Sequence, residues 1–166
     1  MPAGHTTRPT RSLVRQALFN MLGERVHDAA VLDLYSGSGA LGLEALSRGA
    51  ASVVFVERDR RALRALKANI AECRLQPEQA RVLEVSVDSP ASLLLGPFDL
   101  ILADPPFARL DGLPADLDAE GVLSEGACLA VHLPSERLAG RAPAPFKLER
   151  EKAYGRSRIV IFESDS

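Results

Sequence analysis

The feature that most constrains the fold of this chain is a regular alternation between short apolar segments and segments with helical periodicity. Continuous apolar runs are typical of strands buried on both faces of a sheet, and they occur at residues 30–35, 51–56, 80–85, 98–103 and 127–133. The segments between them predict helices at residues 10–23, 36–48, 59–73 and 110–123. Strands separated by single helices imply right-handed crossovers, so the sequence predicts an α/β fold with a parallel sheet covered by helices on both faces.

The C-terminal part of the chain departs from this alternation. After three prolines, two further strands are expected at residues 146–150 and 158–162, joined by a loop that contains Tyr154 and Gly155. A short loop between two strands predicts an antiparallel hairpin. The expected sheet therefore has seven strands and is mostly parallel. A length of 166 residues fits one domain, with a helical segment at 1–27 and the core at 28–166.

Several classes of protein are excluded by composition. No apolar run approaches the roughly 18 residues needed to cross a bilayer, and the N-terminus has no apolar core of a signal peptide. Cys73 and Cys128 lie beside apolar residues and are expected to be small buried side chains in a reducing compartment. The three histidines have no spacing typical of a metal site. We therefore expect a cytoplasmic protein that acts as a monomer, without membrane or metal.

A glycine-rich turn follows the first predicted strand and begins the next helix. Gly37, Gly39 and Gly42 match the spacing of a nucleotide-binding turn, in which small residues let a ligand approach the backbone and the free N–H groups of a helix start. Glu57 ends the second strand and is placed to accept hydrogen bonds from ribose hydroxyls. A turn needed only for packing is the alternative interpretation.

The charge beside this turn bears on the ligand. Asp33 lies at the end of the first strand, directly before the glycines. A carboxylate repels a pyrophosphate and favours a cation, an amino group or a sulfonium. The sequence therefore favours S-adenosylmethionine over a nicotinamide dinucleotide.

A second motif, Asp104-Pro105-Pro106-Phe107, follows the fourth strand. Consecutive prolines make a stiff loop, so the Asp104 carboxylate and the Pro105 carbonyl can each accept a hydrogen bond from one exocyclic amine. Phe107 can stack on the ring that carries the amine. Two acceptors turn the nitrogen lone pair toward a methyl donor, and Asp104 stabilises the positive charge that develops. A rigid turn with a helix-capping aspartate is the alternative.

The net charge of −2 conceals an uneven distribution. Residues 1–27 and residues 147–158 each carry a net charge of +3, whereas residues 110–136 carry −6. Arginine supplies 17 of the 20 basic residues, and its planar guanidinium suits phosphates and base edges. We expect the two basic segments to border the site near Asp104, and the acidic segment to form a solvated outer helix.

These residues resemble a known family. The segment from Asp33 to Gly42 resembles the first motif of class I S-adenosylmethionine-dependent methyltransferases, and residues 104–107 resemble their amino-methylating motif. The segments Arg8-Pro9-Thr10 and 37–49, with Tyr154-Gly155, resemble the bacterial RsmD-type enzymes, which methylate a guanine N2 of small-subunit (16S) ribosomal RNA. The resemblance covers nearly the whole chain and implies a Rossmann-like fold.

The resemblance also implies roles for individual residues. Asp104, Pro105, Pro106 and Phe107 would hold the target guanine. The candidate cofactor-binding residues, for S-adenosylmethionine and its product S-adenosylhomocysteine, are Thr10, Asp33, Tyr35, Ser36, Gly37, Gly39, Glu57, Arg58, Ser86 and Asp88. The candidate RNA-binding residues are Arg8, Arg11, Arg15, Tyr154 and Arg156. The implied partner is 16S ribosomal RNA, free or within a partly assembled small subunit.

The sequence departs from the family pattern in three respects. Seven residues precede Arg8, where the family usually has a basic hairpin, so an RNA-contacting element is expected to be missing or to have been removed. Ser12, Leu13 and Gln16 replace the usual Asp, Arg and Glu of the first segment. The acidic residue expected near the adenine aligns with Ser86, and Asp88 either supplies that contact or, as we favour, caps the helix that follows.

Other functions remain compatible with these residues. The same amino-methylating motif would serve an adenine amine in DNA or a glutamine amide. A nicotinamide-dependent oxidoreductase would use the same glycines and Glu57, and a non-catalytic RNA-binding scaffold is a further possibility. Asp33 and the Asp104 loop argue against the oxidoreductase.

Overall fold

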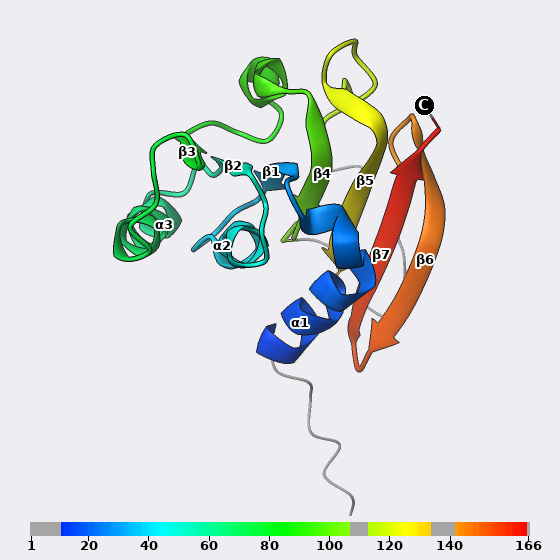
Figure 1. Cartoon of the computed structure of the whole chain (residues 1–166), viewed down its shortest axis with the longest axis horizontal. Coiled ribbons are helices and arrows are strands. Elements are labelled where there is room, and N and C mark those ends of the chain that lie inside the picture. The colour runs from blue at the N-terminus through cyan, green and yellow to red at the C-terminus, as the bar shows by residue number, and fades with distance from the viewer. Residues whose placement is uncertain (1–10, 107–112, 134–141, 166) are drawn as a thin grey trace, which may run out of the picture.

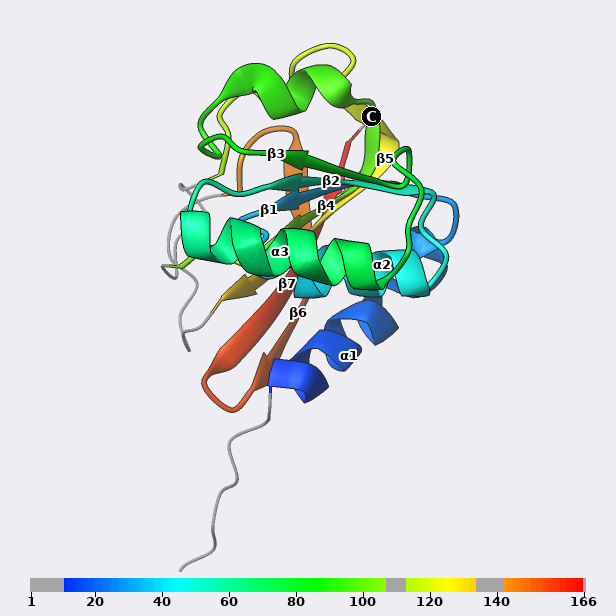
Figure 2. The same ribbon diagram turned by 90° about the vertical axis from the view of Figure 1, so that its left-hand side faces the viewer.

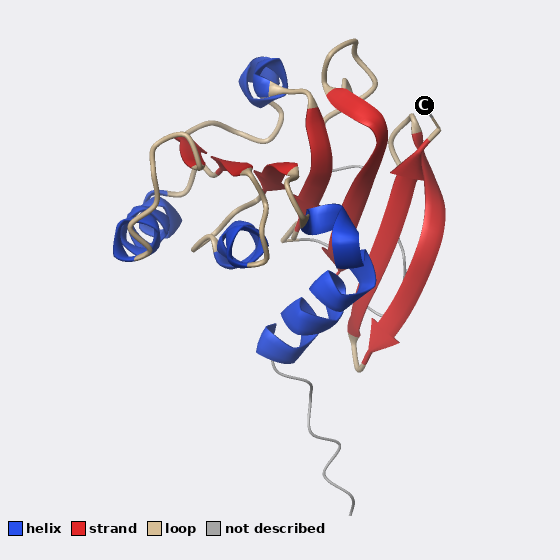
Figure 3. Cartoon of the chain, in the orientation of Figure 1, coloured by secondary structure: helices blue, strands red, loops and turns tan. Residues whose placement is uncertain are grey.

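A seven-stranded sheet forms the centre of the protein, whose computed structural model describes residues 11–106, 113–133 and 142–165 (Figure 1). Figure 3 shows how the helices flank this sheet. The strands are β1 (Ala30–Leu34), β2 (Ser52–Val56), β3 (Ala80–Leu83), β4 (Phe98–Ala103), β5 (Leu123–Leu133), β6 (Phe146–Tyr154) and β7 (Ser157–Ser164). The helices are α1 (Arg11–Leu22), α2 (Ala40–Ser47) and α3 (Arg60–Glu72), with short 3₁₀ helices η1 (Gly23–Val26) and η2 (Pro90–Leu95).

The strand order is β3-β2-β1-β4-β5-β7-β6. Strands β1 to β5 are parallel, whereas β7 is antiparallel to both β5 and β6. The chain winds outward from β1 to β3 and then returns to place β4 on the other side of β1. In open parallel sheets, ligands bind beyond the carboxyl ends of the strands at such a reversal. The predicted parallel sheet with a C-terminal hairpin is confirmed.

The two faces of the sheet are covered differently. Helices α1, α2 and α3 pack on one face, and η2 with residues 113–122 covers the other (Figure 2). Helix α3 is strongly amphipathic, so Leu63 and Leu66 are buried while its arginines face solvent. Its first turn is stabilised by Asp59, whose carboxylate accepts a hydrogen bond of 2.9 Å from the Ala62 N–H.

The helix predicted at residues 110–123 is wrong over its described part. Residues 113–122 form a series of turns, with hydrogen bonds from Ala119 N to Asp116 O and from Val122 N to Ala119 O. Leu113, Leu117 and Val122 are buried against the sheet, and the four-residue spacing of Leu113 and Leu117 imitates a helical period. Gly121, at φ +81°, ends the turns, so β5 begins at Leu123 rather than at residue 127. The acidic side chains of these turns are exposed as expected.

Two further details differ from expectation. Cys128 is buried, but Cys73 is exposed because it lies at the C-terminal end of α3, past the last buried turn of that helix. Strand β6 extends to Tyr154, four residues beyond the prediction. The apolar pattern did not reveal these residues because they are polar and lie on an edge strand exposed to solvent.

In the described part of the chain, no helix is long and apolar enough to cross a membrane.

We expect Leu66→Ala to destabilise the protein by about 2–5 kcal/mol, because it leaves a cavity where α3 meets the sheet. Leu66 is 0% exposed, whereas Leu94 on η2 is 83% exposed. The matched substitution Leu94→Ala should change the free energy of unfolding by less than about 0.5 kcal/mol. Urea unfolding measures both, and equal effects would contradict the packing described for α3.

Candidate active site

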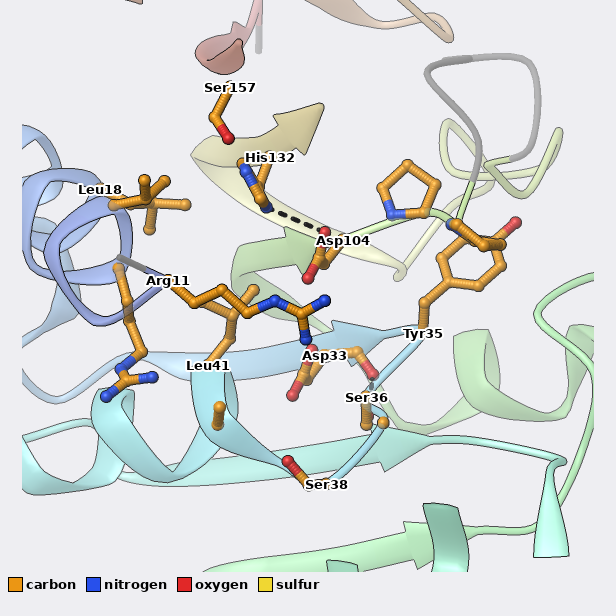
Figure 4. A pocket seen from close by; sticks show the side chains of 16 residues that line it. Arg11, Leu18, Asp33, Tyr35, Ser36, Ser38, Leu41, Asp104, His132 and Ser157 are labelled. Carbon is orange, nitrogen blue, oxygen red and sulfur yellow. Dashed lines mark hydrogen bonds and ion pairs between the residues drawn. The ribbon is translucent and has the colours of Figure 1, made fainter. Parts of the chain in front are cut away.

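The site lies at the carboxyl ends of β1, β4 and β5. Asp33 of β1 pairs with Leu102 of β4, which pairs in turn with Ala130 of β5. Because side chains alternate along a strand, Asp104 and His132, each two residues further on, lie on the same face of the sheet as Asp33. Figure 4 shows these three side chains around one pocket. The register of three strands therefore brings together residues that are far apart in sequence.

The pocket has a volume of about 470 Å³, a size typical of small-molecule sites. One wall comes from α1, another from the turn after β1 and the start of α2, and a third from the loop after β4. Its lining comprises Arg11, Val14, Arg15, Leu18, Asp33, Tyr35, Ser36, Gly37, Ser38, Ala40, Leu41, Asp104, Pro105, Pro106, His132 and Ser157.

Asp33 is a buried carboxylate, 1% exposed. Its Oδ2 accepts a hydrogen bond of 3.1 Å from the Gly42 N–H, whereas its Oδ1 has no partner among the described residues. Burial raises its pKa to about 8, and the negative charges of Asp104 and Glu57 act in the same direction. The hydrogen bond from Gly42 opposes this shift. An unpartnered carboxylate oxygen in a pocket is suited to an ammonium or sulfonium ligand.

Glycine is required at two positions of the turn between β1 and α2. A Cβ at Gly42 would lie 2.3 Å from Phe55 Cε1 and 2.8 Å from Asp33 Oδ2. Gly39 has φ +88°, and a Cβ there would lie 2.5 Å from Leu66 Cδ1. Helix α2 can thus pack directly against the sheet, and its first turn reaches the Asp33 carboxylate.

The residues between Asp33 and the glycines are held by hydrogen bonds to β2. The Ser36 hydroxyl donates to the Asp33 carbonyl at 2.7 Å and accepts from the Val56 N–H at 3.0 Å. Tyr35, before it, adopts φ +56°, a conformation uncommon outside glycine, and lines the pocket. The turn is therefore fixed by the neighbouring strand.

A second pocket of about 340 Å³ adjoins the first. Tyr35, Asp104 and Pro106 line both. Its other lining residues follow β2 and β3 and include four predicted cofactor-binding residues: Glu57, Arg58, Ser86 and Asp88. The turns after β1, β2, β3 and β4 thus all contribute to this pocket.

Glu57 connects two of these turns. Its Oε2 accepts a hydrogen bond of 2.8 Å from the Gly37 N–H, and its Oε1 accepts from the N–H groups of Arg58 and Asp59 at 2.8 and 2.9 Å. Glu57 is partly exposed and lines the second pocket. The carboxylate fixes the glycine turn at the position where a ribose is predicted.

The helix-capping role that we favoured for Asp88 is wrong. The N-cap of η2 is Ser89, whose hydroxyl accepts a hydrogen bond of 3.3 Å from the Ala91 N–H. Asp88 instead lies against Ser86, whose hydroxyl is 3.4 Å from Asp88 Oδ2. Ser89 directly precedes Pro90, the first residue of η2, and therefore takes the N-cap position in place of Asp88. Asp88 lines the second pocket instead.

The loop after β4 presents Asp104 to the pocket. Pro105 is buried, Pro106 is exposed, and the Asp104 side chain is 48% exposed. Phe107, Thr10 and Arg8 lie outside the described residues. Asp104 Oδ1 is 3.0 Å from Nδ1 of His132, which the sequence analysis did not select as a site residue. Its place near the carboxyl end of the strand predicted at residues 127–133 is the sequence signal that could have marked it as a pocket residue.

The described candidates for RNA binding border the first pocket or lie near it. Arg11 and Arg15 of α1 line it, and the Arg15 Nε is 4.0 Å from Glu44 Oε2. Tyr154 ends β6, Arg156 lies in the following turn, and Lys152 Nζ is 5.2 Å from the centre of the Tyr154 ring. The start of α1 and this hairpin turn lie on the same side of the molecule (Figures 1 and 2).

Comparison with known proteins is consistent with this geometry. The model of the family described as "Conserved hypothetical protein 95" matches residues 1–163. The chain belongs to this family. It is 35% identical over 168 residues to the Ribosomal RNA small subunit methyltransferase D of Escherichia coli K12, covering 100% of this chain and 84% of that protein. The predicted resemblance to RsmD-type methyltransferases is confirmed.

Solved structures agree with the assignment. A conserved hypothetical protein of Streptococcus pyogenes aligns with a TM-score of 0.79 and 31% identity, over 91% of this chain and 95% of the other. An RNA methyltransferase of Salinibacter ruber, solved with S-adenosyl-L-homocysteine, shares the fold at a TM-score of 0.64 and 16% identity, over 94% of this chain and 93% of the other. The expected class I methyltransferase fold is confirmed.

We expect Asp33→Asn to remove a pH dependence from the stability of the protein. Because the pKa of Asp33 is raised to about 8, the folded state binds more protons than the unfolded state between about pH 4 and pH 8. This carboxyl therefore destabilises the fold as pH rises through that window, and the effect levels off above it. In urea unfolding, the stability of the wild type relative to Asp33→Asn should fall with pH. A difference in the free energy of unfolding that does not change with pH would contradict the raised pKa of Asp33.

Proposed function

We propose that this chain transfers a methyl group from S-adenosylmethionine to the exocyclic N2 amine of a guanine in 16S ribosomal RNA. The observation that carries this proposal is the shared pocket of Asp33 and Asp104, in which a buried carboxylate suited to a cation lies near a carboxylate suited to an amine. The name of the Escherichia coli relative supports the RNA substrate.

The pocket fits the cofactor on two grounds. The unpartnered Asp33 Oδ1 meets the need of an ammonium or sulfonium group for a negative partner, and the raised pKa of Asp33 means that a bound cation would favour loss of its proton. Tyr35, Glu57 and Asp88 line the adjoining pocket, where the nucleoside part is expected. When bound, S-adenosylmethionine supplies an electrophilic methyl group. The glycines would let it approach the backbone of the turn closely.

The target amine would be held by the loop after β4. The Asp104 carboxylate and the Pro105 carbonyl accept its two N–H groups, so the nitrogen lone pair turns out of the plane of the ring. The positive charge that develops on the nitrogen is stabilised by the nearby carboxylate. The methylated nitrogen then gives its extra proton to water at the exposed side of Asp104. Phe107, which follows this loop, would stack on the guanine.

The RNA would be bound by arginines on the border of the pocket. Arg11 and Arg15 line the first pocket, and the hairpin turn that contains Arg156 lies on the same side of the molecule as the start of α1. These side chains suit phosphates, whereas the acidic turns at 113–122 cover the opposite face of the sheet. The substrate, free or within a partly assembled subunit, would be met in the cytoplasm.

We expect Asp104→Ala to abolish methyl transfer while cofactor binding remains. Loss of the carboxylate removes both an orienting acceptor and a stabilising charge, so the rate should fall at least about 100-fold. The rate is measured with labelled S-adenosylmethionine on 16S RNA, naked and protein-bound, and binding of S-adenosylhomocysteine by calorimetry. Asp116→Ala, in an exposed turn, is the matched control. Retention of activity in Asp104→Ala would refute the proposed mechanism.

We expect the double substitution Arg11→Ala and Arg15→Ala to weaken RNA binding without changing cofactor affinity. Each lost phosphate contact should lower the slope of log affinity against log salt by about one. The control is Arg61→Ala with Arg64→Ala, which removes the same charge from the exposed face of α3. Binding of 16S RNA is measured at several salt concentrations. A larger loss in the α3 pair would place the RNA on α3 instead.

A further inference from the structure

We infer that His132 is a positioning residue that holds the Asp104 carboxylate in the orientation required by the target amine. The inference rests on the proposed function, since it assigns a residue to the same site. It begins from the contact of 3.0 Å between His132 Nδ1 and Asp104 Oδ1, drawn as a dashed line in Figure 4.

The backbone places the two side chains opposite each other. Ala103 of β4 pairs with Val131 of β5, so Asp104 and His132 occupy the next step of the same parallel pair. Strand β5 is held on its other side by β7, where His132 pairs with Ile159. His132 therefore lies on a strand that is hydrogen-bonded to a neighbouring strand on each side, whereas Asp104 lies in the loop that follows β4.

The two side chains differ in freedom. Asp104 is 48% exposed and faces both pockets, while His132 is 18% exposed. A half-exposed aspartate without a partner would occupy several rotamers. A hydrogen bond from a more buried and strand-anchored ring selects one of them.

The chemistry of the pair fixes the roles of its atoms. An ionised carboxylate can only accept hydrogen bonds, so His132 Nδ1 carries the proton and donates it. The other ring nitrogen, Nε2, is buried and has no partner among the described residues. In the part of the chain that the structure describes, Asp104 is thus the one hydrogen-bonding partner of this ring.

This arrangement gives the two carboxylate oxygens of Asp104 different roles. Oδ1 is engaged by His132, which leaves Oδ2 to accept an N–H group of the target. The lone pair of the amine can attack only if that N–H group is held in the correct direction. Removing the histidine should therefore lower the rate of methyl transfer and leave the affinities for cofactor and RNA nearly unchanged.

Two near-isosteric substitutions separate positioning from packing. The side-chain amide of Asn can place an N–H donor near the position of Nδ1, whereas that of Gln places its donor near the position of Nε2. A packing role predicts similar behaviour of the two variants. A positioning role predicts that His132→Asn retains activity and that His132→Gln loses it.

The first experiment measures single-turnover methyl transfer with saturating cofactor and RNA. We expect the rate to fall about ten- to hundredfold in His132→Gln and His132→Ala, and to stay within about threefold of wild type in His132→Asn. Affinities for S-adenosylhomocysteine and RNA should stay within about threefold in all variants. Equal rates for the Asn and Gln variants would overturn the inference.

A second measurement needs no activity and no cofactor. NMR of protein labelled with ¹⁵N in its histidines reports which ring nitrogen is protonated, and the signal of His132 is the one absent from His132→Asn. We expect the proton on Nδ1 in the wild type and a loss of that preference in Asp104→Ala. A proton fixed on Nε2 would overturn the inference. If the wild type shows the expected tautomer but does not methylate RNA, the proposed function is wrong, whereas the hydrogen bond from His132 to Asp104 remains supported.

Discussion

The hydrogen-bonded register of β1, β4 and β5 is the constraint on which the whole site depends. Side chains alternate along each strand, so a shift of one residue between β1 and β4 would move either Asp33 or Asp104 to the opposite face. The observed register sets Asp33 against Leu102, and Leu102 against Ala130. The apolar runs that form these strands are buried on both faces, so the same residues that build the core also set the geometry of the carboxylates.

The consequence of this register is a concentration of carboxyl groups. These groups are Asp33, Glu57 and Asp104, which come from three different strands. The negative charges of Glu57 and Asp104 both raise the pKa of Asp33. A buried carboxylate without a full set of partners costs stability, and a bound cation would relieve that cost. The site is thus destabilising by itself and suited to a positively charged cofactor, which agrees with membership of a methyltransferase family.

Much of this could be predicted from the sequence, for physical reasons that differ between elements. The strands, the glycine turn and the Asp104 loop were predictable because apolar runs and glycines respond to local constraints. The turns at 113–122 were not, since Leu113 and Leu117 have helical spacing but pack on the sheet without a helix. His132 was missed because its role depends on a neighbouring strand, and strand order is not written in any local pattern. The exposure of Cys73 likewise depends on where α3 ends.

The central claim is that the protein methylates an amine of guanine at the site formed by the carboxyl ends of β1, β4 and β5. The most direct measurement is to incubate the protein with 16S RNA and S-adenosylmethionine carrying a labelled methyl group, digest the RNA and identify the labelled nucleoside. The account predicts N2-methylguanosine from a single position. A label found on adenine, or one transferred to DNA or protein but not to RNA, would contradict it.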